Sequence, residues 1–214
     1  MTMSIDPSAF SPIGEAIEDF KNGKFLIVMD DECRENEGDL IMAAQFMDLQ
    51  KMAFLVRHSS GYICAPLSEE RADELNLPLM LPASKQTDPH KTAYTITVDY
   101  KIGTTTGISS RDRAVTCLKL ADLEAKPEDF SRPGHIVPLR AKRNLLSERQ
   151  GHTEAAIELC RLSNLASAAV ICELVRDDDG LMKRLDDCIQ FSRQFGIKLI
   201  SIKDLIAFVN STGL

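Results

Sequence analysis

The sequence predicts an α/β fold, a single domain built as a three-layer α/β/α sandwich around a mixed sheet. Short apolar runs alternate with amphipathic segments along the chain, a pattern typical of a sheet covered by helices on both faces. With 214 residues, 44% of them hydrophobic and 27% charged, the chain has the composition of an ordinary folded domain. No repeat or Pro/Gly/Ser-rich linker divides it, so we expect one domain over residues 1–214 with a flexible N-terminus at 1–10.

The first half of the chain carries clear signals for the ends of helices. Ser11 and Pro12 favour the start of a helix, and Gly23 favours its end. Asp48 and Ser68 are suitable N-cap residues for two further helices. Helices are therefore expected at 12–22, 49–58 and 69–76, and strands at 24–30, 40–46, 61–67 and, from its alternating pattern, 92–101.

The second half repeats the alternation of helix and strand more regularly. Helices are expected at 108–122, 152–164, 181–196 and 203–210, and strands at 134–141, 168–175 and 198–202. The segment 168–175, AAVICELV, is almost wholly apolar, which is typical of a strand covered on both faces.

Charge and missing targeting signals exclude several classes of protein. A net charge of −7 and a pI near 5.2 argue against binding to nucleic acid or to an anionic membrane surface. No apolar run reaches the roughly 18 residues of a membrane span, and the N-terminus has no signal-peptide pattern. The six cysteines are scattered singly without a C-x-x-C pair, which favours reduced thiols in a cytoplasmic protein over disulfides or a zinc site.

The segment DDECRENEGDL, residues 30–40, is dense in carboxylates and directly follows an apolar strand. One interpretation is a solvated charged turn. A calcium loop fails, because aligning Gly38 with the required glycine places Cys33 and Ala44 at ligand positions. The third interpretation is a metal and acid/base site, since open α/β sheets tend to bind ligands at the ends of their strands.

Spacing favours the metal and acid/base interpretation. In an extended segment alternate side chains share a face, so Glu35, Glu37 and Asp39 would point the same way. A divalent cation that takes oxygen ligands, such as Mg²⁺, offsets the repulsion among such carboxylates. Arg34 beside them can pair with a carboxylate or grip an anionic substrate.

A second cluster lies in RQGHTEAA, residues 149–156, at the start of a predicted helix. The first turn of a helix offers free N–H groups and the positive end of a dipole, which together form a phosphate site. Arg149 adds a forked cation, Thr153 a hydroxyl, and His152 an imidazole that can bind a metal. The alternative is an ordinary helix start with an incidental histidine.

Two further residues are candidates for proton transfer. Glu173 interrupts the apolar run AAVICELV, and apolar neighbours would raise the pKa of its carboxyl toward that of a general acid or base. The alternative for Glu173 is the polar face of an edge strand. His135 lies in RPGHIVPL, where a Pro-Gly turn enters a strand, and the alternative there is a purely structural histidine.

Taken together, these motifs resemble a known family. DDECRENEGDL, TTGISSRDRA, RPGHIVPLRA and ERQGHTEAA, in this order, resemble 3,4-dihydroxy-2-butanone 4-phosphate synthase of riboflavin biosynthesis, over about Ile13 to Val209. The resemblance implies a lyase that converts D-ribulose 5-phosphate into formate and L-3,4-dihydroxy-2-butanone 4-phosphate with Mg²⁺ or Mn²⁺. It also implies a three-layer α/β/α sandwich and a homodimer, and the short remainder of the chain implies no GTP cyclohydrolase domain of the kind that some relatives carry.

Carried over by position, the resemblance assigns roles to residues of these motifs. Glu35 and His152 match the metal ligands. The implied catalytic residues are His135, Glu173 and Glu37. The implied substrate-binding residues are Arg34, Glu35, Asp39, Arg149, Gln150, Gly151, His152 and Thr153. The loop TTGIS, residues 105–109, matches a supporting polar loop.

Two other functions compete with this one. A metal-dependent phosphosugar isomerase or aldolase would share the cation and the phosphate grip but would release no formate. A non-catalytic phosphosugar-binding module would need no proton carriers such as Glu173 and His135. Formate release from ribulose 5-phosphate separates the three functions.

Cys33 departs from the family pattern, which commonly has an acid at this position. An exposed thiol in a mobile loop can form a mixed disulfide with glutathione, which we state as a hypothesis for Cys33. Mass spectrometry that finds only the free thiol under oxidant would contradict it.

Overall fold

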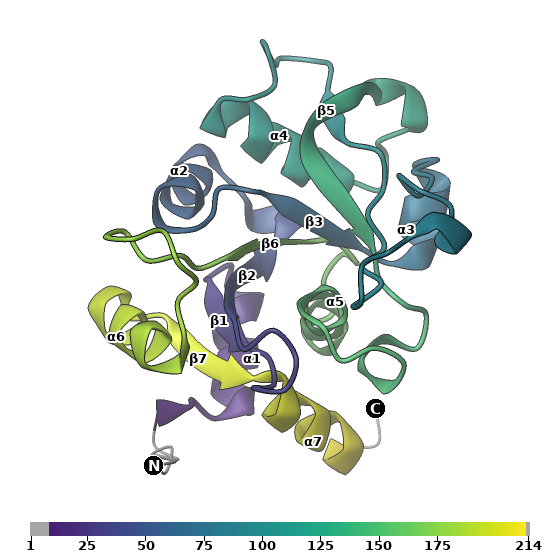
Figure 1. Ribbon diagram of the computed structural model, residues 1–214. Coiled ribbons are helices and arrows are strands. Elements are labelled where there is room, and N and C mark those ends of the chain that lie inside the picture. The colour runs from purple at the N-terminus through teal and green to yellow at the C-terminus, as the bar shows by residue number, and fades with distance from the viewer. Residues whose placement is uncertain (1–8, 213–214) are drawn as a thin grey trace.

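Seven strands form one mixed sheet in the computed structural model, which describes residues 9–212 (Figure 1). The strands are β1 (Leu26–Met29), β2 (Gly38–Ala43), β3 (Cys64–Leu67), β4 (Val98–Tyr100), β5 (Phe130–Arg140), β6 (Ala169–Glu173) and β7 (Lys198–Ser201). Their order in the sheet is β4-β5-β3-β6-β2-β1-β7. The pairs β1–β7 and β3–β5 are parallel, and the remaining pairs are antiparallel. The predicted mixed sheet is confirmed.

Helices cover both faces of this sheet. They are α1 (Ile13–Lys21), α2 (Leu49–His58), α3 (Glu69–Glu74), α4 (Ser110–Leu120), α5 (His152–Leu162), α6 (Leu185–Phe195) and α7 (Ile202–Thr212). Side chains of α1, α5 and α7 share one hydrophobic core with the sheet, and side chains of α2, α3, α4 and α6 share a second core on the opposite face. The two cores make the fold a three-layer α/β/α sandwich in a single domain, as predicted.

The central strands are apolar throughout because both of their faces are covered. In β1, Leu26 and Val28 belong to the core beneath α1, α5 and α7, whereas Ile27 and Met29 belong to the other core. Successive side chains of a strand point to opposite faces, so a strand between two helical layers buries every residue. The location of β1 between two helical layers therefore explains the apolar run that follows residue 24.

Local capping chemistry sets several helix boundaries where they were predicted. The carboxylate of Asp48 accepts the backbone N–H of Lys51 at 2.8 Å, and the hydroxyl of Ser68 accepts that of Arg71 at 3.1 Å. These bonds satisfy donors that lack a partner in the first turn of a helix. The first helix begins at Ile13 with Pro12 rather than Ser11 as its cap residue, one position later than predicted.

Other boundaries were predicted wrongly. Of the segment 92–101, only Val98–Tyr100 is a strand, because Tyr94 and Thr95 make isolated bridges instead of a continuous ladder. The strand predicted at 134–141 is the second part of the longer β5.

Two further elements are shorter than their patterns suggested. The strand predicted at 40–46 begins at Gly38 and ends at Ala43, where a 3-10 turn starts. The helix predicted at 181–196 begins only at Leu185. Residues 1–8 of the predicted flexible N-terminus lie outside the described residues.

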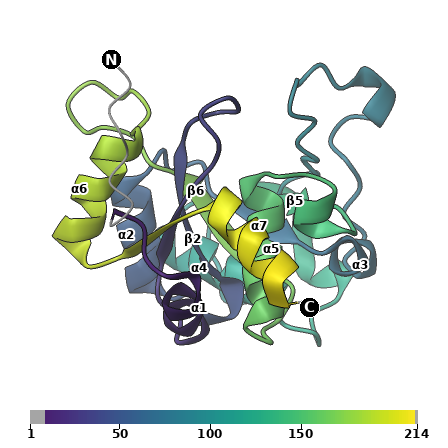
Figure 2. The same cartoon turned by 90° about the horizontal axis from the view of Figure 1, so that it is seen from below.

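The acidic segment is a hairpin loop at one end of the sheet. Residues 30–37 join the antiparallel strands β1 and β2, with Met29 opposite Gly38. Figure 2 shows this dark purple loop standing out on the same side as the blue-teal segment that follows α3. Next to it, β6 pairs with β2 so that Glu173 lies opposite Asp39. Across residues 9–212, every helix is too short or too polar to cross a bilayer.

Candidate functional site

The loop between β1 and β2 is folded around the carboxylate of Asp30. This side chain is buried and accepts the backbone N–H groups of Glu37 at 2.8 Å and Glu35 at 3.1 Å, and Nη1 of Arg34 at 2.8 Å. Burial raises the pKa of Asp30, but these hydrogen bonds and the nearby imidazole of His152 outweigh it and hold the pKa below its ordinary value. The loop is therefore organised by an ionised, buried acid.

The conformation of this loop corrects one prediction. Residues 32–35 form turns rather than an extended segment, so alternation does not bring the acids together. Glu35, Glu37 and Asp39 nevertheless line one pocket, because Glu35 and Glu37 come from the folded loop and Asp39 from strand β2. Arg184, which precedes α6, holds the tip of the loop by donating to the carbonyl of Glu35 at 2.8 Å.

The acids of this pocket have different environments. Asp39 is 2% exposed, and within residues 9–212 its Oδ1 atom has no hydrogen-bond partner. Burial, followed by repulsion from Glu173 and Glu35, raises the pKa of Asp39 well above its ordinary value. Burial and the charge of Glu35 also raise the pKa of Glu37. Both carboxyls therefore hold a proton more readily than Asp30 does.

His152 is the first residue of α5 and lies against the end of β1. Its Nε2 atom donates to the carbonyl oxygen of Val28 at 3.0 Å, because a carbonyl can only accept. Its Nδ1 atom then faces two carboxylates, at 3.8 Å from Oε2 of Glu35 and 3.7 Å from Oδ1 of Asp39. Burial lowers the pKa of His152, which favours the neutral imidazole that binds metals.

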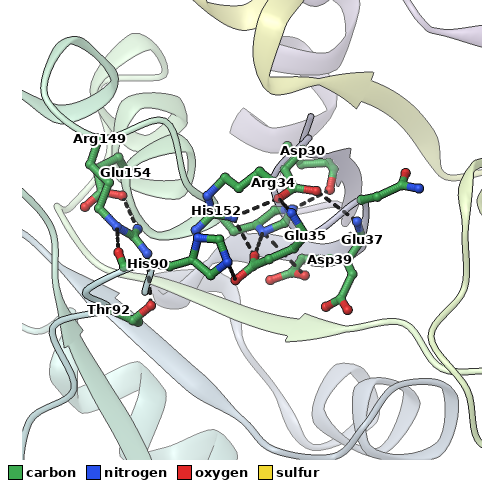
Figure 3. Close-up of polar contacts among 12 residues, drawn as sticks. Asp30, Arg34, Glu35, Glu37, Asp39, His90, Thr92, Arg149, His152 and Glu154 are labelled. Carbon is green, nitrogen blue, oxygen red and sulfur yellow. Dashed lines mark hydrogen bonds and ion pairs between the residues drawn. The ribbon is translucent and has the colours of Figure 1, made fainter. Parts of the chain in front are cut away.

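The donor atoms of this cluster suit a hard divalent cation. One ligand atom each of Asp30, Glu35 and His152 lies within 4.8 Å of the others, and Figure 3 shows these side chains converging. Carboxylate oxygens with an imidazole nitrogen match Mg²⁺ or Mn²⁺, which bind a few protein groups and complete their shells with water and substrate. The unpartnered Oδ1 atom of Asp39 adds a further acceptor at the same place. The residues therefore fit such an ion, and the predicted pair of Glu35 and His152 is brought together.

The start of α5 lies beside this cluster, and Arg149 precedes it. Arg149 donates from Nη1 to Glu154 at 2.6 Å, from Nε to the carbonyl of His90 at 3.0 Å and from Nη2 to Thr92 at 3.0 Å (Figure 3). These contacts fix its guanidinium at the edge of the pocket, which Thr153 also lines. Free N–H groups at a helix start and a guanidinium beside them are groups that can bind an anion.

Gly151 makes this arrangement sterically possible. A Cβ atom at Gly151 would lie 2.3 Å from Nη1 of Arg149 and 3.1 Å from Nη2 of Arg34. The two guanidinium groups therefore converge where only a glycine leaves room. Gln150, predicted with them, is exposed and lies instead in a separate hollow beside Asp31.

Glu173 ends β6 at the same pocket. Its Oε2 atom accepts the hydroxyl of Ser60 at 2.7 Å, and it lies opposite Asp39 across the β2–β6 ladder. The edge-strand alternative is wrong, because β6 lies between β3 and β2 in the middle of the sheet. Asp39 and Glu173 thus place two carboxyls on neighbouring strands facing one space.

His135 lies outside this pocket. It lies in β5 four residues before Leu139, which lines the pocket. Its imidazole pairs with Asp99 on the neighbouring strand, at 2.6 Å between Nδ1 and Oδ2. Of the predicted proton-transfer residues, Glu37 and Glu173 therefore line the pocket, and His135 lies outside it.

Some residues of the site were not predicted. Asp30 carried a signal, since it is the first acid after an apolar strand. Cys64 and Tyr94 also line the pocket, but a cysteine and a tyrosine within apolar segments give no pattern that points to a site. Cys33 is exposed, as its proposed oxidation requires.

Comparisons with known proteins agree with this geometry. The family model for 3,4-dihydroxy-2-butanone 4-phosphate synthase matches residues 14–208. A 3,4-dihydroxy-2-butanone 4-phosphate synthase from Candida albicans is 62% identical over 94% of this chain and 98% of its own length. A probable bifunctional riboflavin biosynthesis protein of Oryza sativa, described as chloroplastic, is 51% identical over 93% of this chain and 37% of its own length. A crystal structure of a 3,4-dihydroxy-2-butanone 4-phosphate synthase in complex with two magnesium ions superimposes with a TM-score of 0.90, at 47% identity, covering 95% of this chain and 99% of that one.

Proposed function

The chain belongs to the 3,4-dihydroxy-2-butanone 4-phosphate synthase family, and we propose that it converts D-ribulose 5-phosphate into formate and L-3,4-dihydroxy-2-butanone 4-phosphate, a riboflavin precursor. It is a lyase that uses a divalent cation. The observation that carries the assignment to this pocket is the position of Glu35 beside His152, next to the positive start of α5.

The phosphate end of the substrate fits the start of α5. Arg149 is held in place by its three partners, and Arg34 approaches it across Gly151. Thr153 and the free N–H groups of the helix complete a site for a doubly charged anion. Binding there fixes the sugar carbons over the acids of β2 and β6, which turns proton transfer into a local event.

Glu35 and His152 would hold the cation, with Asp30 behind them. When bound, Mg²⁺ or Mn²⁺ polarises carbonyl and hydroxyl oxygens of the sugar and stabilises developing negative charge. Arg34 contacts both Asp30 at 2.8 Å and Glu35 at 2.5 Å, so it keeps the ligand carboxylate in place.

Glu37, Asp39 and Glu173 supply the proton transfers. Burial and neighbouring acids raise the pKa of both Glu37 and Asp39 above the ordinary range, which favours proton exchange with the substrate. Glu173 is oriented by Ser60 and faces Asp39, so acids act on different carbons of one substrate. The loop that carries Glu35 and Glu37 lines the pocket, and its closure over bound substrate would exclude water from reactive intermediates.

In the proposed reaction, His135 reaches the substrate only when two copies of the chain form a homodimer. The exposed apolar side chains of Ile102 and Ile108 lie in the connection between β4 and α4, and Gly107 of the same connection lies against the Asp99–His135 pair. Such side chains favour contact with a second copy, which would bring His135 to the substrate. The cytoplasmic location remains a prediction from the sequence.

Incubation with ribulose 5-phosphate labelled with ¹³C tests the function. With Mg²⁺ or Mn²⁺, we expect ¹³C NMR to show formate and the four-carbon ketone phosphate in equal amounts, and neither product after chelation. Isomerised or cleaved sugar without formate would indicate an isomerase or aldolase. Saturable binding without any product would indicate a binding module.

A further inference from the structure

One side chain from outside the acidic loop, residues 30–37, forms hydrogen bonds to it. Within the loop, the carboxylates of Asp30 and Asp31 and the carbonyl of Asp31 accept the backbone N–H groups of residues 33–37. Across the described residues 9–212, the hydrogen bonds that reach residues 31–37 from outside the loop both come from Arg184. This arginine directly precedes α6, far from the loop in sequence.

Arg184 holds the tip of the loop through two successive backbone carbonyls. Its Nη1 atom donates to the oxygen of Glu35 at 2.8 Å and to that of Asn36 at 2.5 Å, which uses both N–H groups of this nitrogen. Asn36 has a φ of +53°, in the left-handed region, so the chain turns sharply where the arginine binds. The backbone N–H of Arg184 donates to Asp187 at 3.0 Å, and this bond anchors the arginine to the first turn of α6.

A cavity leaves part of the loop without packed neighbours. It has a volume of about 580 Å³ and lies between the loop and the starts of α6 and α7. Figure 2 shows the loop projecting from the end of the sheet. Segments with few packed contacts open more easily than a packed core, so the hydrogen bonds that remain determine where they lie. The cavity is lined on the loop side by Asp31, Glu32, Cys33 and Asn36, and opposite them by Phe10, Leu185, Ser201, Lys203 and Asp204.

The position of the loop decides where the carboxylate of Glu35 lies. Arg34 holds this carboxylate from within the loop, at 2.5 Å, whereas Arg184 holds the backbone of the same residue from outside. His152, whose Nδ1 atom lies 3.8 Å from Oε2 of Glu35, belongs to α5. The distance between the two proposed ligands therefore depends on how the tip of the loop is attached to the rest of the protein.

We propose that Arg184 is a positioning residue that holds the tip of the acidic loop so that Glu35 faces His152 before a cation binds. This inference rests on the proposed function, in which Glu35 and His152 hold the cation. Arg184 does not itself line the pocket, so it acts through the backbone of the loop. Its guanidinium lies 3.9 Å from Oε1 of Glu37, which places a positive charge beside a second acid of the same loop.

Cys33 provides a reporter of loop motion. It is the exposed cysteine of the loop, and the other five cysteines are buried, so a thiol-specific nitroxide labels it selectively. In EDTA, the electron paramagnetic resonance spectrum of the labelled wild type should contain the broad component of an immobilised nitroxide. Arg184→Met removes both hydrogen bonds to the loop, and we expect this broad component to be lost.

Cation affinity is the second measurement. We expect Arg184→Met to weaken Mn²⁺ binding to the unlabelled protein by about 10- to 100-fold, the usual cost of losing a group that orients metal ligands. Formate release should return to near the wild-type rate at saturating Mn²⁺, because the bound ion then holds Glu35 in place. Arg184→Lys keeps a cation that can donate to both carbonyls, so it should recover part of the affinity and of the broad component.

Arg193→Met is the matched control, since it makes the same change at an exposed arginine of the same helix. It should keep the wild-type spectrum and Mn²⁺ affinity. A freely mobile label at Cys33 in the wild type would overturn the proposal even if Arg184→Met failed to fold. An unchanged spectrum or an unchanged Mn²⁺ affinity in Arg184→Met would overturn it as well.

Failure of the proposed function would give a different result. If Glu35→Gln bound Mn²⁺ as tightly as the wild type, the cation site would lie elsewhere and Arg184 could not position its ligand. The spectra of labelled Cys33 would then still show whether Arg184 holds the loop.

Discussion

His152 turns its Nδ1 atom toward Oε2 of Glu35, 3.8 Å away, because its Nε2–H is donated to the carbonyl oxygen of Val28. The hydrogen bond fixes both the tautomer and the rotation of the ring before any ligand arrives. Histidines that bind metals commonly have their second nitrogen fixed in this way. The end of strand β1 therefore orients the imidazole at the start of α5 toward the acidic loop, as the proposed cation site requires.

Removing either proposed ligand should abolish cation binding and turnover together. We expect Glu35→Gln and His152→Ala to weaken Mn²⁺ binding by about 100-fold or more, since even residues that only support metal ligands cost 10- to 100-fold. Electron paramagnetic resonance of free Mn²⁺ measures the affinity, and formate release measures turnover.

Glu32→Gln is the matched control for these two variants. Glu32 lies in the same loop but is exposed. Its replacement should leave the Mn²⁺ affinity and kcat as in the wild type. Near-normal Mn²⁺ binding by the Glu35 or His152 variant would refute that residue as a ligand.

Glu173→Gln should separate substrate binding from chemistry. The amide keeps the shape of the side chain and can still accept the hydroxyl of Ser60, but it cannot carry a proton at neutral pH. We expect kcat to fall by about 10²- to 10⁴-fold, the usual contribution of a general acid or base, while ribulose 5-phosphate binds with unchanged affinity. Calorimetry on the inactive variant measures the affinity.

Ser60→Ala is the companion variant for Glu173. It removes the orienting hydroxyl and leaves the carboxylate, so a smaller loss of kcat is expected than for Glu173→Gln. If Glu173→Gln released formate at the wild-type rate, this carboxylate would be dispensable.

Gly151→Ala should weaken the binding of phosphate. The added methyl group would overlap Nη1 of Arg149 at 2.3 Å and displace the guanidinium from the start of α5. We expect KM and the inhibition constant of inorganic phosphate to rise by about tenfold, since one hydrogen bond to a charged group contributes roughly 1.5 to 3 kcal/mol.

Gly14→Ala controls for the general effect of adding a methyl group at a glycine. Gly14 lies in α1, and a Cβ atom there meets nothing within 4 Å. Both constants should stay at their wild-type values in this variant. An unchanged phosphate inhibition constant in Gly151→Ala would place the phosphate elsewhere.

Helix ends set by residues close in sequence were predictable from the sequence. Side-chain pairs that depend on how distant strands align were not. Asp48 and Ser68 cap helices through bonds to residues three positions away, so their helices were predicted correctly. Glu35 and His152 lay in recognisable motifs. The pairing of Asp99 with His135 depends on a break in the β4–β5 ladder, which no spacing in the sequence reveals.

The acids of the loop were correctly predicted to lie together, although the loop is not extended as that prediction assumed. Glu35, Glu37 and Asp39 share a pocket, but the loop is turned around Asp30 instead of being extended. The sequence showed Asp30 only as one more acid in a run. Its role depends on burial and on backbone donors that appear after the hairpin closes.

At pH values above the pKa of Asp30 in the unfolded chain, the ionised carboxylate of Asp30 should stabilise the metal-free protein. Its pKa is lowered in the folded state from an ordinary value of 3.8, so the stability that its ionisation contributes is present above that value and is lost as pH falls through the folded pKa. We expect Asp30→Asn to lower the free energy of unfolding at pH 7 by about 1 to 3 kcal/mol, as for a buried hydrogen-bonding group left without its partner. Urea titration in EDTA measures it, and an unchanged midpoint would contradict this role.

Asp39 should have the opposite effect, because its pKa is raised well above the ordinary value of 3.8 by burial and by neighbouring acids. The unfolded chain then releases a proton at a lower pH than the folded one, so stability is lost as pH rises from about 4 toward the folded pKa. In EDTA at pH 7, Asp39→Asn should raise the free energy of unfolding, because the amide carries no charge for burial and the neighbouring acids to disfavour. The gain over the wild type should vanish when urea titrations are repeated near pH 3. A variant less stable than the wild type at pH 7 would show that favourable contacts hold Asp39 in place. It would also show that repulsion among the carboxyls of the pocket does not destabilise the metal-free protein.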